Sequence, residues 1–560
     1  MTSSGAIRSP LQAFEDTVKR RGNAVAMVQP LGGGELRNYT WNELREEALK
    51  VASYLRSLDY PQGTHIALMS KNCAEWIIAD LAIWLAGHVS VPLYPTLTST
   101  TVGQIMTHSE APVLFVGKLD VWDEAKAGVP DGVHQIAFSQ APEDARKSAA
   151  ARLEEVIASH EPLKDPASPS GDALATIIYT SGTTGMPKGV MHSFEAFSVV
   201  GSKMIDVYSM DASDRMISYL PLSHVAERAA VELSMLYVGQ TIFFAESLET
   251  FGEDIKRARP TMFFAVPRIW TKFYQKASEA LPPAKLNKLL RIPILGGIVK
   301  KKILTAMGLQ DCRIALSGAA ALSPELIEWF GKIGLEILEV YGMTENMAWS
   351  HTTRSGDQQV GWVGKPNEGV ECRIAENGEI LVKSLGNMVG YYKEPEKTAE
   401  SFEGGDWLKT GDKGEIDSEG RLRITGRVKE IFKTEKGKYV APAPIENRLV
   451  SQPGVEQACV MGPGMSQPIA LLSLSEEEAK KLFGEGREQF TRELEALREK
   501  VNKAIDAHER LQALVVVPDF WTVENGLVTP TLKLKRSELE KFYEGRISEW
   551  AGKRGVVWAA

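Results

Sequence analysis

The strongest constraint on the fold of this chain is a polar loop that directly follows an apolar run. Residues 174–179, LATIIY, predict a buried strand, and the chain continues as TSGTTGMPKGV to residue 190. Hydroxyl groups and glycine amides in such a loop approach an anion closely, and Lys188 adds a positive charge suited to nucleotide phosphates. The loop is not a Walker A motif, because Pro187 stands where that motif needs glycine. Taken alone, the stretch also fits a flexible linker rich in Ser, Thr and Gly.

Length and composition indicate a multidomain globular protein. A chain of 560 residues exceeds what one hydrophobic core supports, so we expect two or more domains. Hydrophobic residues make up 44% and charged residues 24%, and no apolar run approaches the roughly 20 residues of a membrane span. The first 22 residues lack an apolar secretory core, and the final VVWAA carries no recognised address signal. We therefore expect a cytoplasmic protein with no transmembrane segment.

Cysteine spacing and net charge exclude several functional classes. The four cysteines lie without CxxC or Cys/His spacing, which indicates reduced thiols rather than a disulfide framework or a zinc site. The net charge of −8 argues against nonspecific nucleic-acid binding, so no nucleic-acid partner is expected.

The order of apolar patterns predicts an α/β fold. Helical spacing at 41–57 and 74–89 alternates with short β-rich runs at 65–69 and 113–116. The polar stretch 139–170, which ends in Pro and Ser, predicts a connecting segment before the phosphate loop.

The C-terminal third changes character twice. Short strands around ENGE at 376–379 and DSEG at 417–420 predict hairpins in a β-rich portion. Beyond it, a mixture of strands and helices, including a helical pattern at 476–505, predicts a small α+β unit. We expect the boundary near Lys429.

One basic segment stands apart in this acidic chain. Residues 281–310 contain six Lys and Arg residues and no acidic residue, mixed with Leu and Ile. Such a segment could contact an anionic membrane surface, which would place the protein peripherally at the inner face of a membrane. The alternative, which the sequence favours, is an amphipathic helical insertion with solvated lysines.

Five separated motifs occur in a fixed order. Besides the loop, they are YGMTE at 341–345, WLKTGD at 407–412, GRVKE at 426–430 and TPTLKLKR at 529–536. This series resembles the AMP-forming acyl-CoA synthetase family, which includes luciferases and peptide-synthetase adenylation domains. The long-chain fatty acyl-CoA synthetases look most similar, through the runs VPLYPT at 91–96, SYLPLSHVAER at 218–228 and GNMVGYYKEPEKTAESF at 386–402.

The resemblance implies a fold and a reaction. The expected fold is a large N-terminal domain of two doubly wound sheets plus a distorted β-barrel over 1–427, a hinge at 428–430, and a small mobile α+β lid over 431–560. The implied cofactors are ATP, Mg²⁺ and CoA. A carboxylate attacks the α-phosphate of ATP to give acyl-AMP and pyrophosphate, and the CoA thiol then displaces AMP.

The resemblance also assigns the phosphate loop. The loop would hold the β- and γ-phosphates and offset the charge that repels the incoming carboxylate. Its members are Thr180, Ser181, Gly182, Thr183, Thr184, Gly185 and the catalytic candidate Lys188.

Further nucleotide contacts follow from the same resemblance. In SGAAALSPE, Gly318, Ala319 and Ala320 would line the adenine pocket, with Tyr341 stacked on the purine. Read without the resemblance, SPE is equally a helix cap. The resemblance also places three neighbouring residues at the cofactor, namely Glu339, Gly342 and Met343.

The phosphate and ribose contacts complete the nucleotide site. Thr344 would hydrogen-bond the α-phosphate, and Glu345 would bind magnesium, where an isolated acid would be merely solvated. Asp412 would accept the ribose hydroxyls with help from Arg427, although an aspartate in a turn is usually structural. Lys429 falls at the hinge, and an ordinary linker lysine is the alternative.

The acylating lysine and the residues around the acyl group rest on register. Lys533 matches the lysine that contacts the reacting carboxylate and α-phosphate, but Leu532 stands where the family commonly has glycine, and Lys535 and Arg536 lie close by. His224 matches a position beside the acyl carboxylate and is otherwise a packed or capping histidine. In the lid, Gly437 within KTEKGKYV would permit close approach to the pantetheine of CoA.

The leading hypothesis is a CoA ligase for a medium- to long-chain fatty acid. One alternative is an adenylating enzyme that uses another carboxylate or a carrier-protein acceptor. A second is a catalytically impaired lipid-binding paralogue, which only the departure at Leu532 supports.

Overall fold

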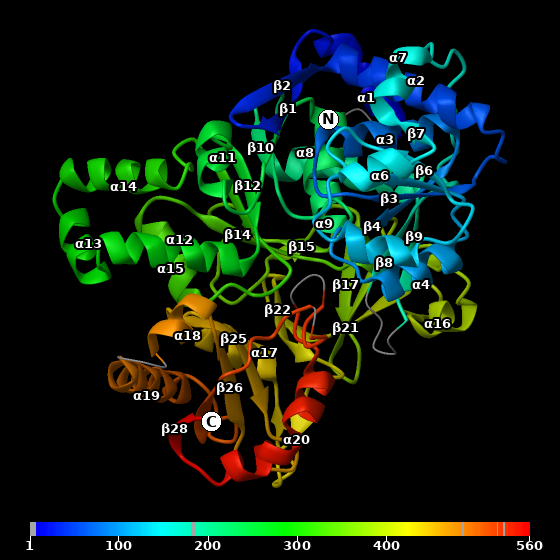
Figure 1. Cartoon of the computed structure of the whole chain (residues 1–560). Coiled ribbons are helices and arrows are strands. Elements are labelled where there is room, and N and C mark those ends of the chain that lie inside the picture. Colours follow the sequence, from blue (N-terminus) through cyan, green and yellow to red (C-terminus); the bar gives the residue numbers. More distant parts are fainter. Residues whose placement is uncertain (1–6, 181–185, 483–485, 524, 530–532, 560) are drawn as a thin grey trace.

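The computed structural model describes residues 7–180, 186–482, 486–523, 525–529 and 533–559 (Figure 1). A large α/β body occupies the upper part of the view, and the chain after about residue 430 forms a smaller unit below it. The loop residues Ser181, Gly182, Thr183, Thr184 and Gly185, and also Leu532, lie outside the described residues.

The first sheet of the body carries the phosphate loop. It has eight strands, and those from β4 to β7 in its spatial order are parallel. In spatial order the strands are β19 (Gly390–Tyr391), β9 (Lys188–Ser193), β8 (Leu174–Thr180), β4 (Val89–Leu93), β3 (His65–Met69), β5 (Val113–Val116), β6 (His134–Ala137) and β7 (Ala151–Arg152). The predicted strands at 65–69 and 113–116 form with the expected bounds.

The second layer of the body consists of two sheet segments that meet where β10 contacts β12. The first contains β10 (Arg215–Ser218), β11 (Thr241–Phe244), β1 (Val25–Gly32) and β2 (Glu35–Thr40). The second contains β12 (Met262–Ala265), β13 (Ile314–Ser317), β14 (Ile337–Tyr341), β15 (His351–Thr352) and β16 (Lys365–Pro366).

A fully buried helix joins the two layers. Every residue of α3 (Ala74–Ala86) is buried, because the helix contacts β3 and β4 of the first sheet and β1 of the second. Its sequence, AEWIIADLAIWLA, is accordingly apolar on all sides. We expected helix to residue 89, but α3 ends earlier because Gly87 adopts the left-handed conformation (φ 88°) and Val89 opens β4.

Other helices cover the sheets. The predicted helix at 41–57 forms as α2 (Trp41–Ser57) with a capping box at Thr40. The predicted connecting stretch at 139–170 is partly regular, with two short helices around β7. The covering helices include α1 (Pro10–Arg21), α4 (Ser99–Ser109), α5 (Trp122–Ala125), α6 (Glu143–Ser148), α7 (Leu153–Ser159), α8 (Phe194–Tyr208), α9 (Val225–Glu227), η2 (Arg228–Leu233), α10 (Ser234–Val238), α11 (Phe251–Ala258) and α15 (Pro324–Lys332).

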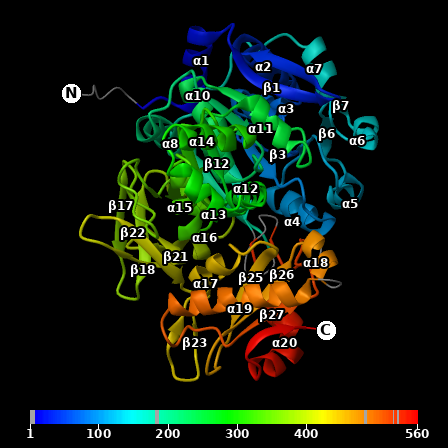
Figure 2. The ribbon, with the colours of Figure 1, turned by 90° about the vertical axis from the view of Figure 1, so that its left-hand side faces the viewer.

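A helical arm projects from the body between β12 and β13. Figure 1 shows it extending to the left, and Figure 2 shows it pointing toward the viewer. It consists of α12 (Pro267–Ala280), α13 (Pro283–Leu290) and α14 (Leu295–Ala306), so the basic segment 281–310 is a helical insertion.

An antiparallel sheet closes the body, and its hairpin turns follow β17 and β21 as predicted. Its strands are β17 (Val370–Ile374), β18 (Glu379–Ser384), β21 (Trp407–Ile416), β20 (Phe402–Glu403) and β22 (Leu422–Arg427), and the short helix α16 (Pro395–Glu400) lies before β20.

The C-terminal unit packs its own sheet against its own helices. A two-stranded ribbon precedes a four-stranded sheet with two separate apolar clusters. Its elements are β23 (Phe432–Lys433), β24 (Tyr439–Val440), α17 (Pro442–Leu449), β25 (Val455–Met461), β26 (Ile469–Leu474), α18 (Glu476–Leu482), α19 (Arg487–Lys503), β27 (Ala513–Val517), α20 (Arg536–Ala551) and β28 (Gly555–Trp558).

Candidate active site

The ends of the phosphate loop are fixed by an antiparallel strand pair. Thr180 at the end of β8 lies opposite Lys188 at the start of β9. The described part of the loop leaves Met186 exposed, while Lys188 is half-buried with its ammonium Nζ 4.8 Å from the ring centroid of Tyr391. The strand prediction therefore holds, and it fixes where the loop begins and ends.

A tight turn after β14 presents Thr344 and Glu345. The imidazole of His192, on β9, donates from Nε2 to the Thr344 carbonyl oxygen at 2.7 Å, and burial lowers the pKa of His192 to about 4. The hydroxyl of Tyr391 donates to Glu345 Oε1 at 2.8 Å, and the backbone N–H of Met388 donates to the Glu345 carbonyl at 2.7 Å. Strands β9 and β19 thus hold the turn η3 (Thr344–Asn346) from two sides.

The candidate adenine loop follows β13. Gly318 is buried, and a Cβ there would lie 2.7 Å from Val340 Cγ2, so this backbone position needs glycine. Ala319, with φ 67°, and Ala320 are exposed. Burial raises the pKa of Glu339 on β14 to about 7, and its Oε1 accepts the backbone N–H of Leu322 at 3.2 Å.

The SPE run after this loop also performs its predicted capping role. Ser323 is the N-cap of α15, and its side chain accepts the backbone N–H of Leu326. The loop and the cap are therefore consecutive features of one segment.

A side-chain network joins β14 of the second layer to the antiparallel sheet that closes the body. It consists of Tyr341, Asp412 and Arg427. The Tyr341 hydroxyl donates to Asp412 Oδ2 at 2.7 Å, and Arg427 Nε lies 3.3 Å from Asp412 Oδ1. Burial raises the pKa of Asp412, and Arg427 opposes that shift. Gly342 and Met343 connect Tyr341 to the Thr344 turn, so the nucleotide candidates after β14 are contiguous.

Lys533, an exposed residue of the C-terminal unit, is close enough for its charge to act on Asp412. Desolvation lowers the pKa of the Lys533 ammonium, and the charge of Arg427 lowers it further, whereas Asp412 and Glu345 oppose the change. Charged side chains of the body therefore act on this lysine. Arg536 lies elsewhere, because its guanidinium binds both oxygens of Glu446 at 2.8 and 3.0 Å within the lid.

His224 lies at the same junction. It is the N-cap of α9, where Nδ1 accepts the backbone N–H of Ala226 at 3.1 Å. Burial lowers the pKa of His224 to about 4, and the charge of Lys533 contributes to the lowering. The capping interpretation is correct, and the charge of the candidate acylating lysine also acts on the imidazole.

The remaining predicted positions lie on the connection and in the lid. Lys429 is exposed in the turn between β22 and β23, and Gly437 has φ 71° in the ribbon β23–β24. Figure 2 shows this ribbon at the lower edge of the molecule. Gly437 is therefore not brought to the junction that Lys533 occupies in this arrangement.

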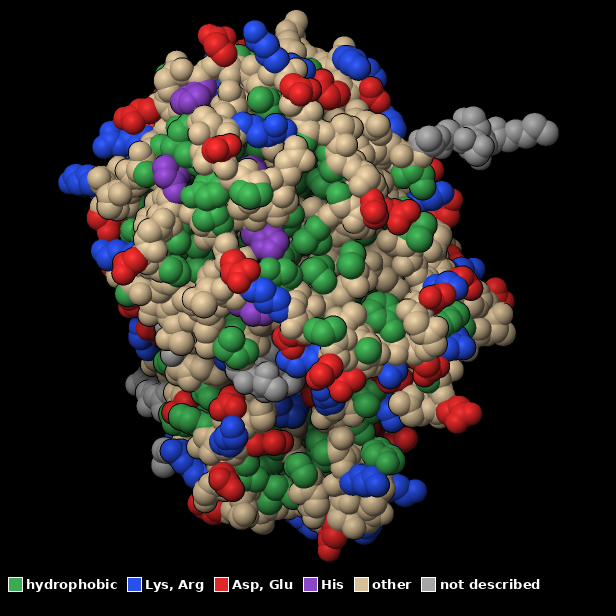
Figure 3. All heavy atoms as spheres, turned by 90° about the vertical axis from the view of Figure 1, so that its right-hand side faces the viewer, with side chains coloured by type: hydrophobic (Ala, Val, Ile, Leu, Met, Phe, Trp, Pro, Cys, Tyr) green, Lys and Arg blue, Asp and Glu red, His purple; other side chains and the backbone are tan. Residues whose placement is uncertain are grey.

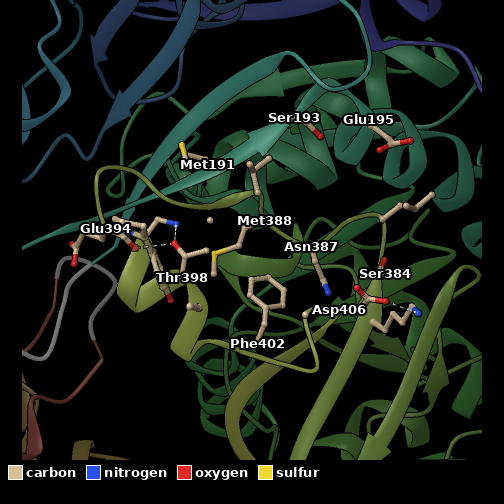
Figure 4. Close-up of a pocket in the computed structure, with 18 of the residues that line it drawn as sticks. Met191, Ser193, Glu195, Ser384, Asn387, Met388, Glu394, Thr398, Phe402 and Asp406 are labelled. Carbon is tan, nitrogen blue, oxygen red and sulfur yellow. Dashed lines mark hydrogen bonds and ion pairs between the residues drawn. The ribbon is translucent and has the colours of Figure 1, made fainter.

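A cavity of about 1180 Å³ lies next to Tyr391 and Met388, the two residues that contact Glu345, and away from Asp412 and Lys533. Figure 4 shows Met388, Asn387 and Phe402 around it, with Glu195 and Asp406 at its margins. Neither Asp412 nor Lys533 lines it. We therefore do not place the reacting groups there, but its wall includes Tyr391 and Met388, the residues that contact Glu345.

The side chains available in the site suit a magnesium ion that is already bound to substrate phosphates. Among the described residues there is no group of three or more His, Cys, Asp or Glu side chains arranged around a metal position. Glu345 is a single carboxylate, linked to the phosphate-loop lysine through the side chain of Tyr391. Magnesium typically binds one or two carboxylates together with substrate phosphates, so Glu345 fits that role.

Sequence reasoning missed His192 and Tyr391. Both touch residues more than 40 positions away, so no local pattern reveals their contacts. Tyr391 does fall inside the run 386–402 that carries the resemblance, which is the signal that could have identified it.

The site and fold have counterparts in known proteins. Residues 14–392 match the family model described as AMP-binding enzyme, and residues 430–552 match the AMP-binding enzyme C-terminal domain. A long-chain-fatty-acid–CoA ligase of Mycobacterium bovis is 31% identical, covering 94% of this chain and 96% of that protein. Long-chain-fatty-acid–CoA ligase 5 of Mus musculus is 30% identical, covering 94% and 87%.

Solved structures share the whole fold. The adenylation domain of a carboxylate reductase from Mycobacterium chelonae matches with a TM-score of 0.83 and 22% identity, covering 98% of this chain and 92% of that chain. An anthranilate CoA ligase in complex with anthranoyl-AMP matches with a TM-score of 0.80 and 22% identity, covering 98% and 100%. The expected architecture of a large N-terminal α/β domain with a smaller C-terminal domain is thus confirmed.

Proposed function

This chain belongs to the AMP-binding enzyme family, and from that premise we propose that it is an AMP-forming long-chain fatty acid–CoA ligase. The relatives that bear this name align over 94% of the chain. The observation that carries the proposal is the network of Tyr341, Asp412 and Arg427 in the body, where the charge of Lys533 from the C-terminal unit also acts on Asp412. Substrates of the proposed reaction are a fatty acid, ATP and CoA.

The first half-reaction brings two anions together, so the site must supply positive charge. The fatty acid carboxylate attacks the α-phosphorus, the bond to the bridging oxygen breaks, and pyrophosphate leaves. Lys188 and the loop from Thr180 would hold the departing phosphates, and Lys533 would contact the carboxylate and the α-phosphate. Magnesium, held by Glu345, would neutralise phosphate charge when bound.

The nucleoside would be held by neutral and acidic groups. Asp412 would accept the ribose hydroxyls in place of part of its present contact with Tyr341. The exposed backbone at Ala319 and Ala320 leaves a flat surface for the purine, with Glu339 supporting the loop from behind. His224 stays neutral near pH 7, because its pKa is about 4, so it would act as a polar gate rather than as a cation.

The second half-reaction requires another lid arrangement. We place the hinge at 428–430, between an N-terminal domain of residues 1–427 and a lid of residues 431–560. Rotation about Lys429 would withdraw Lys533 and bring Gly437 toward the body, where the ribbon would line the path of the CoA pantetheine. The thiol then displaces AMP to form the thioester.

Product analysis tests the proposal. The protein is incubated with ATP, magnesium, CoA and a panel of carboxylic acids, and the products are identified by mass spectrometry. Long-chain acyl-CoA, AMP and pyrophosphate are expected. A product that appears only with a carrier protein, or with acids of another class, would favour a different adenylating ligase. Absence of ATP–pyrophosphate exchange with every fatty acid would favour the impaired paralogue.

We also propose that the arm contacts an anionic membrane surface, which would make the protein peripheral. Four apolar side chains are exposed in the turn between α13 and α14 and at the start of α14. Ile292, Ile294, Leu295 and Ile298 are 48, 85, 38 and 58% exposed. None of the six basic side chains of residues 281–310 forms an ion pair with a residue that the structure describes; they are Lys285, Lys288, Arg291, Lys300, Lys301 and Lys302. On the opposite side of the molecule, Figure 3 shows acidic and basic side chains intermingled.

Vesicle sedimentation tests this contact. We expect binding to vesicles that contain anionic lipid, weaker binding to neutral vesicles, and loss of binding in Ile294→Asp/Ile298→Asp. Leu248→Asp is the matched control, because Leu248 is 82% exposed outside the arm. Equal binding by both variants would exclude the arm as the contact. Within the described residues, no helix has the length and apolar character needed to cross a bilayer.

A further inference from the structure

Tyr391 contacts both of the residues proposed to manage the phosphates. Its hydroxyl donates to Glu345 Oε1 at 2.8 Å, and its ring centroid lies 4.8 Å from Lys188 Nζ. Resting on the proposed function, we infer that Tyr391 is a positioning residue, which fixes the metal-binding carboxylate and the phosphate-binding ammonium relative to each other. It belongs to neither the loop nor the turn.

The backbone around Tyr391 is held by strand β9 on one side and by Thr398 on the other. Strand β19 pairs with β9, so that Tyr391 lies opposite Val190 and Gly390 opposite Met191. The N–H of Tyr391 donates to Thr398 Oγ1 at 2.8 Å, and the N–H of Tyr392 donates to the Gly189 carbonyl at 2.8 Å. The side chain is only 7% exposed. The backbone of Tyr391 is therefore fixed, so its side chain can hold neighbouring side chains in place.

The hydroxyl contact orients the carboxylate of Glu345. Because Tyr391 donates to Oε1, one carboxylate oxygen is committed to the protein, and among the described residues Oε2 accepts no hydrogen bond. A carboxylate with one oxygen bound and one available is suited to a single bond with a phosphate-carried magnesium. The backbone contact from Met388 N–H to the Glu345 carbonyl fixes the same residue at its main chain.

The ring contact positions the ammonium of Lys188. Lysine at the first residue of β9 lies diagonally across the strand pair from Tyr391, where side chains are within reach of each other. A cation over an aromatic face is attracted to it while its N–H groups remain available to phosphate oxygens. The two contacts use different parts of one side chain, so they can be separated by mutation.

Nucleotide binding tests the role without relying on turnover. ATP affinity is measured by calorimetry with magnesium and with EDTA. Tyr391→Phe removes the hydroxyl and keeps the ring, so we expect affinity with magnesium to fall about tenfold and affinity in EDTA to stay at the wild-type value. Tyr391→Leu also removes the ring, so affinity in EDTA should fall about threefold as well.

Two further variants guard against a merely structural effect. Tyr392→Phe is the matched control, because the neighbouring ring instead lies against His65 and His108, with centroids 5.0 and 5.5 Å away. It should bind ATP as the wild type does in both conditions. In a Glu345→Gln background, Tyr391→Phe should produce no additional loss with magnesium, since the hydroxyl acts through that carboxylate.

Three results would overturn the inference. They are unchanged magnesium-dependent affinity in Tyr391→Phe, an equal loss with and without magnesium, and a full tenfold loss on top of Glu345→Gln. A wild-type protein that fails to bind ATP with magnesium would instead contradict the proposed function itself.

Discussion

At the residue scale, several side chains in this region have pKa values that burial has shifted. Burial lowers the pKa of His192 and His224 to about 4 and raises the pKa of Glu227, next to Arg228, to about 8. Lys533 also has a lowered pKa, with Arg427 nearby. Perturbed groups of this kind gather where a protein handles charge, and here His192 contacts the Thr344 turn, while Glu227 lies on the short helix that His224 caps.

Lys533 and Lys535 give a direct test of the acylating role. Lys533→Ala should lower adenylation by a factor of 100 or more, because the reacting anions lose their cation, while conversion of supplied acyl-AMP to acyl-CoA persists. Lys535→Ala should retain adenylation, since Lys535 is the N-cap of α20. Pyrophosphate exchange and a thioester assay measure the two steps. Equal loss of both steps in Lys533→Ala would contradict the assignment.

Glu227 makes stability depend on pH in a predictable direction. Burial raises its pKa from 4.5 to about 8, although Ser218 and Tyr219 donate to its Oε1 at 2.9 and 3.1 Å. The folded state holds a proton that the unfolded state releases, so this contribution is full below pH 4.5 and is lost as pH rises to about 8. Glu227→Gln cannot titrate and should be more stable relative to wild type at pH 8 than at pH 5.

Denaturant midpoints at these two pH values measure the effect. Glu279→Gln, in the exposed last turn of α12, serves as a control that should follow the wild-type pH profile. Parallel profiles for wild type and Glu227→Gln would show that Glu227 is ionised in the fold.

At the element scale, a buried ionic cluster fastens α3 to the π-helical turn η2. Arg228 is fully buried and binds Asp80 of α3, Glu232 at 2.9 Å and Thr176 of β8 at 2.6 Å. Its guanidinium also lies 5.3 Å from the ring centroids of Trp84 and Phe197. The cluster joins the first sheet, its covering helix and the segment that carries His224.

Removing the arginine should leave the buried side chains of Asp80 and Glu232 without their cationic partner. Arg228→Met should destabilise the protein by about 3–5 kcal/mol, the usual result of breaking a buried ion pair from one side. Lys256→Met, which removes an exposed partner of Glu253, should change stability little. Denaturant unfolding followed by tryptophan fluorescence compares them. An equally small effect of both substitutions would mean that the cluster stays solvated.

Helices and strands with a regular spacing of apolar residues could be predicted from the sequence, whereas long-range contacts could not. The strands at 65–69 and 113–116 and the helix at 41–57 formed with the predicted bounds because their apolar spacing matches one buried face. The helix from 74 ended early because a left-handed glycine overrides apolar content. At the candidate site, motifs located the loop and the YGMTE turn, but the Tyr391 contact depends on β19 pairing with a strand 200 residues earlier.

At the scale of the whole molecule, two ion pairs join the lid to α12 of the arm and to the neighbouring helix α15. Arg268, at the start of α12, pairs with Glu456 of β25, and Lys500 of α19 lies 3.1 Å from Glu325 at the start of α15. Figure 1 shows these helices facing α18 and α19 across the junction. Both pairs exist in the arrangement that brings Lys533 to Asp412, so they favour the lid position proposed for adenylation.

Reversing one of these charges should change the balance between the half-reactions. Glu456→Lys would repel Arg268, so adenylation should fall severalfold while thioester formation from supplied acyl-AMP is kept or increased. The swap Arg268→Glu/Glu456→Lys should restore adenylation toward the wild-type rate. Half-reaction rates measure both variants. If the swap does not restore adenylation, the pair does not control lid position.

The histidine that caps α9 has a consequence for observing this protein at work. The low pKa of His224 depends on burial and also on the charge of Lys533, which the lid carries. A lid that carried the lysine away would remove that charge, and the imidazole would then take up a proton more readily. His224 is therefore a natural probe of domain orientation, whose titration distinguishes the closed arrangement from the rotated one without any added label.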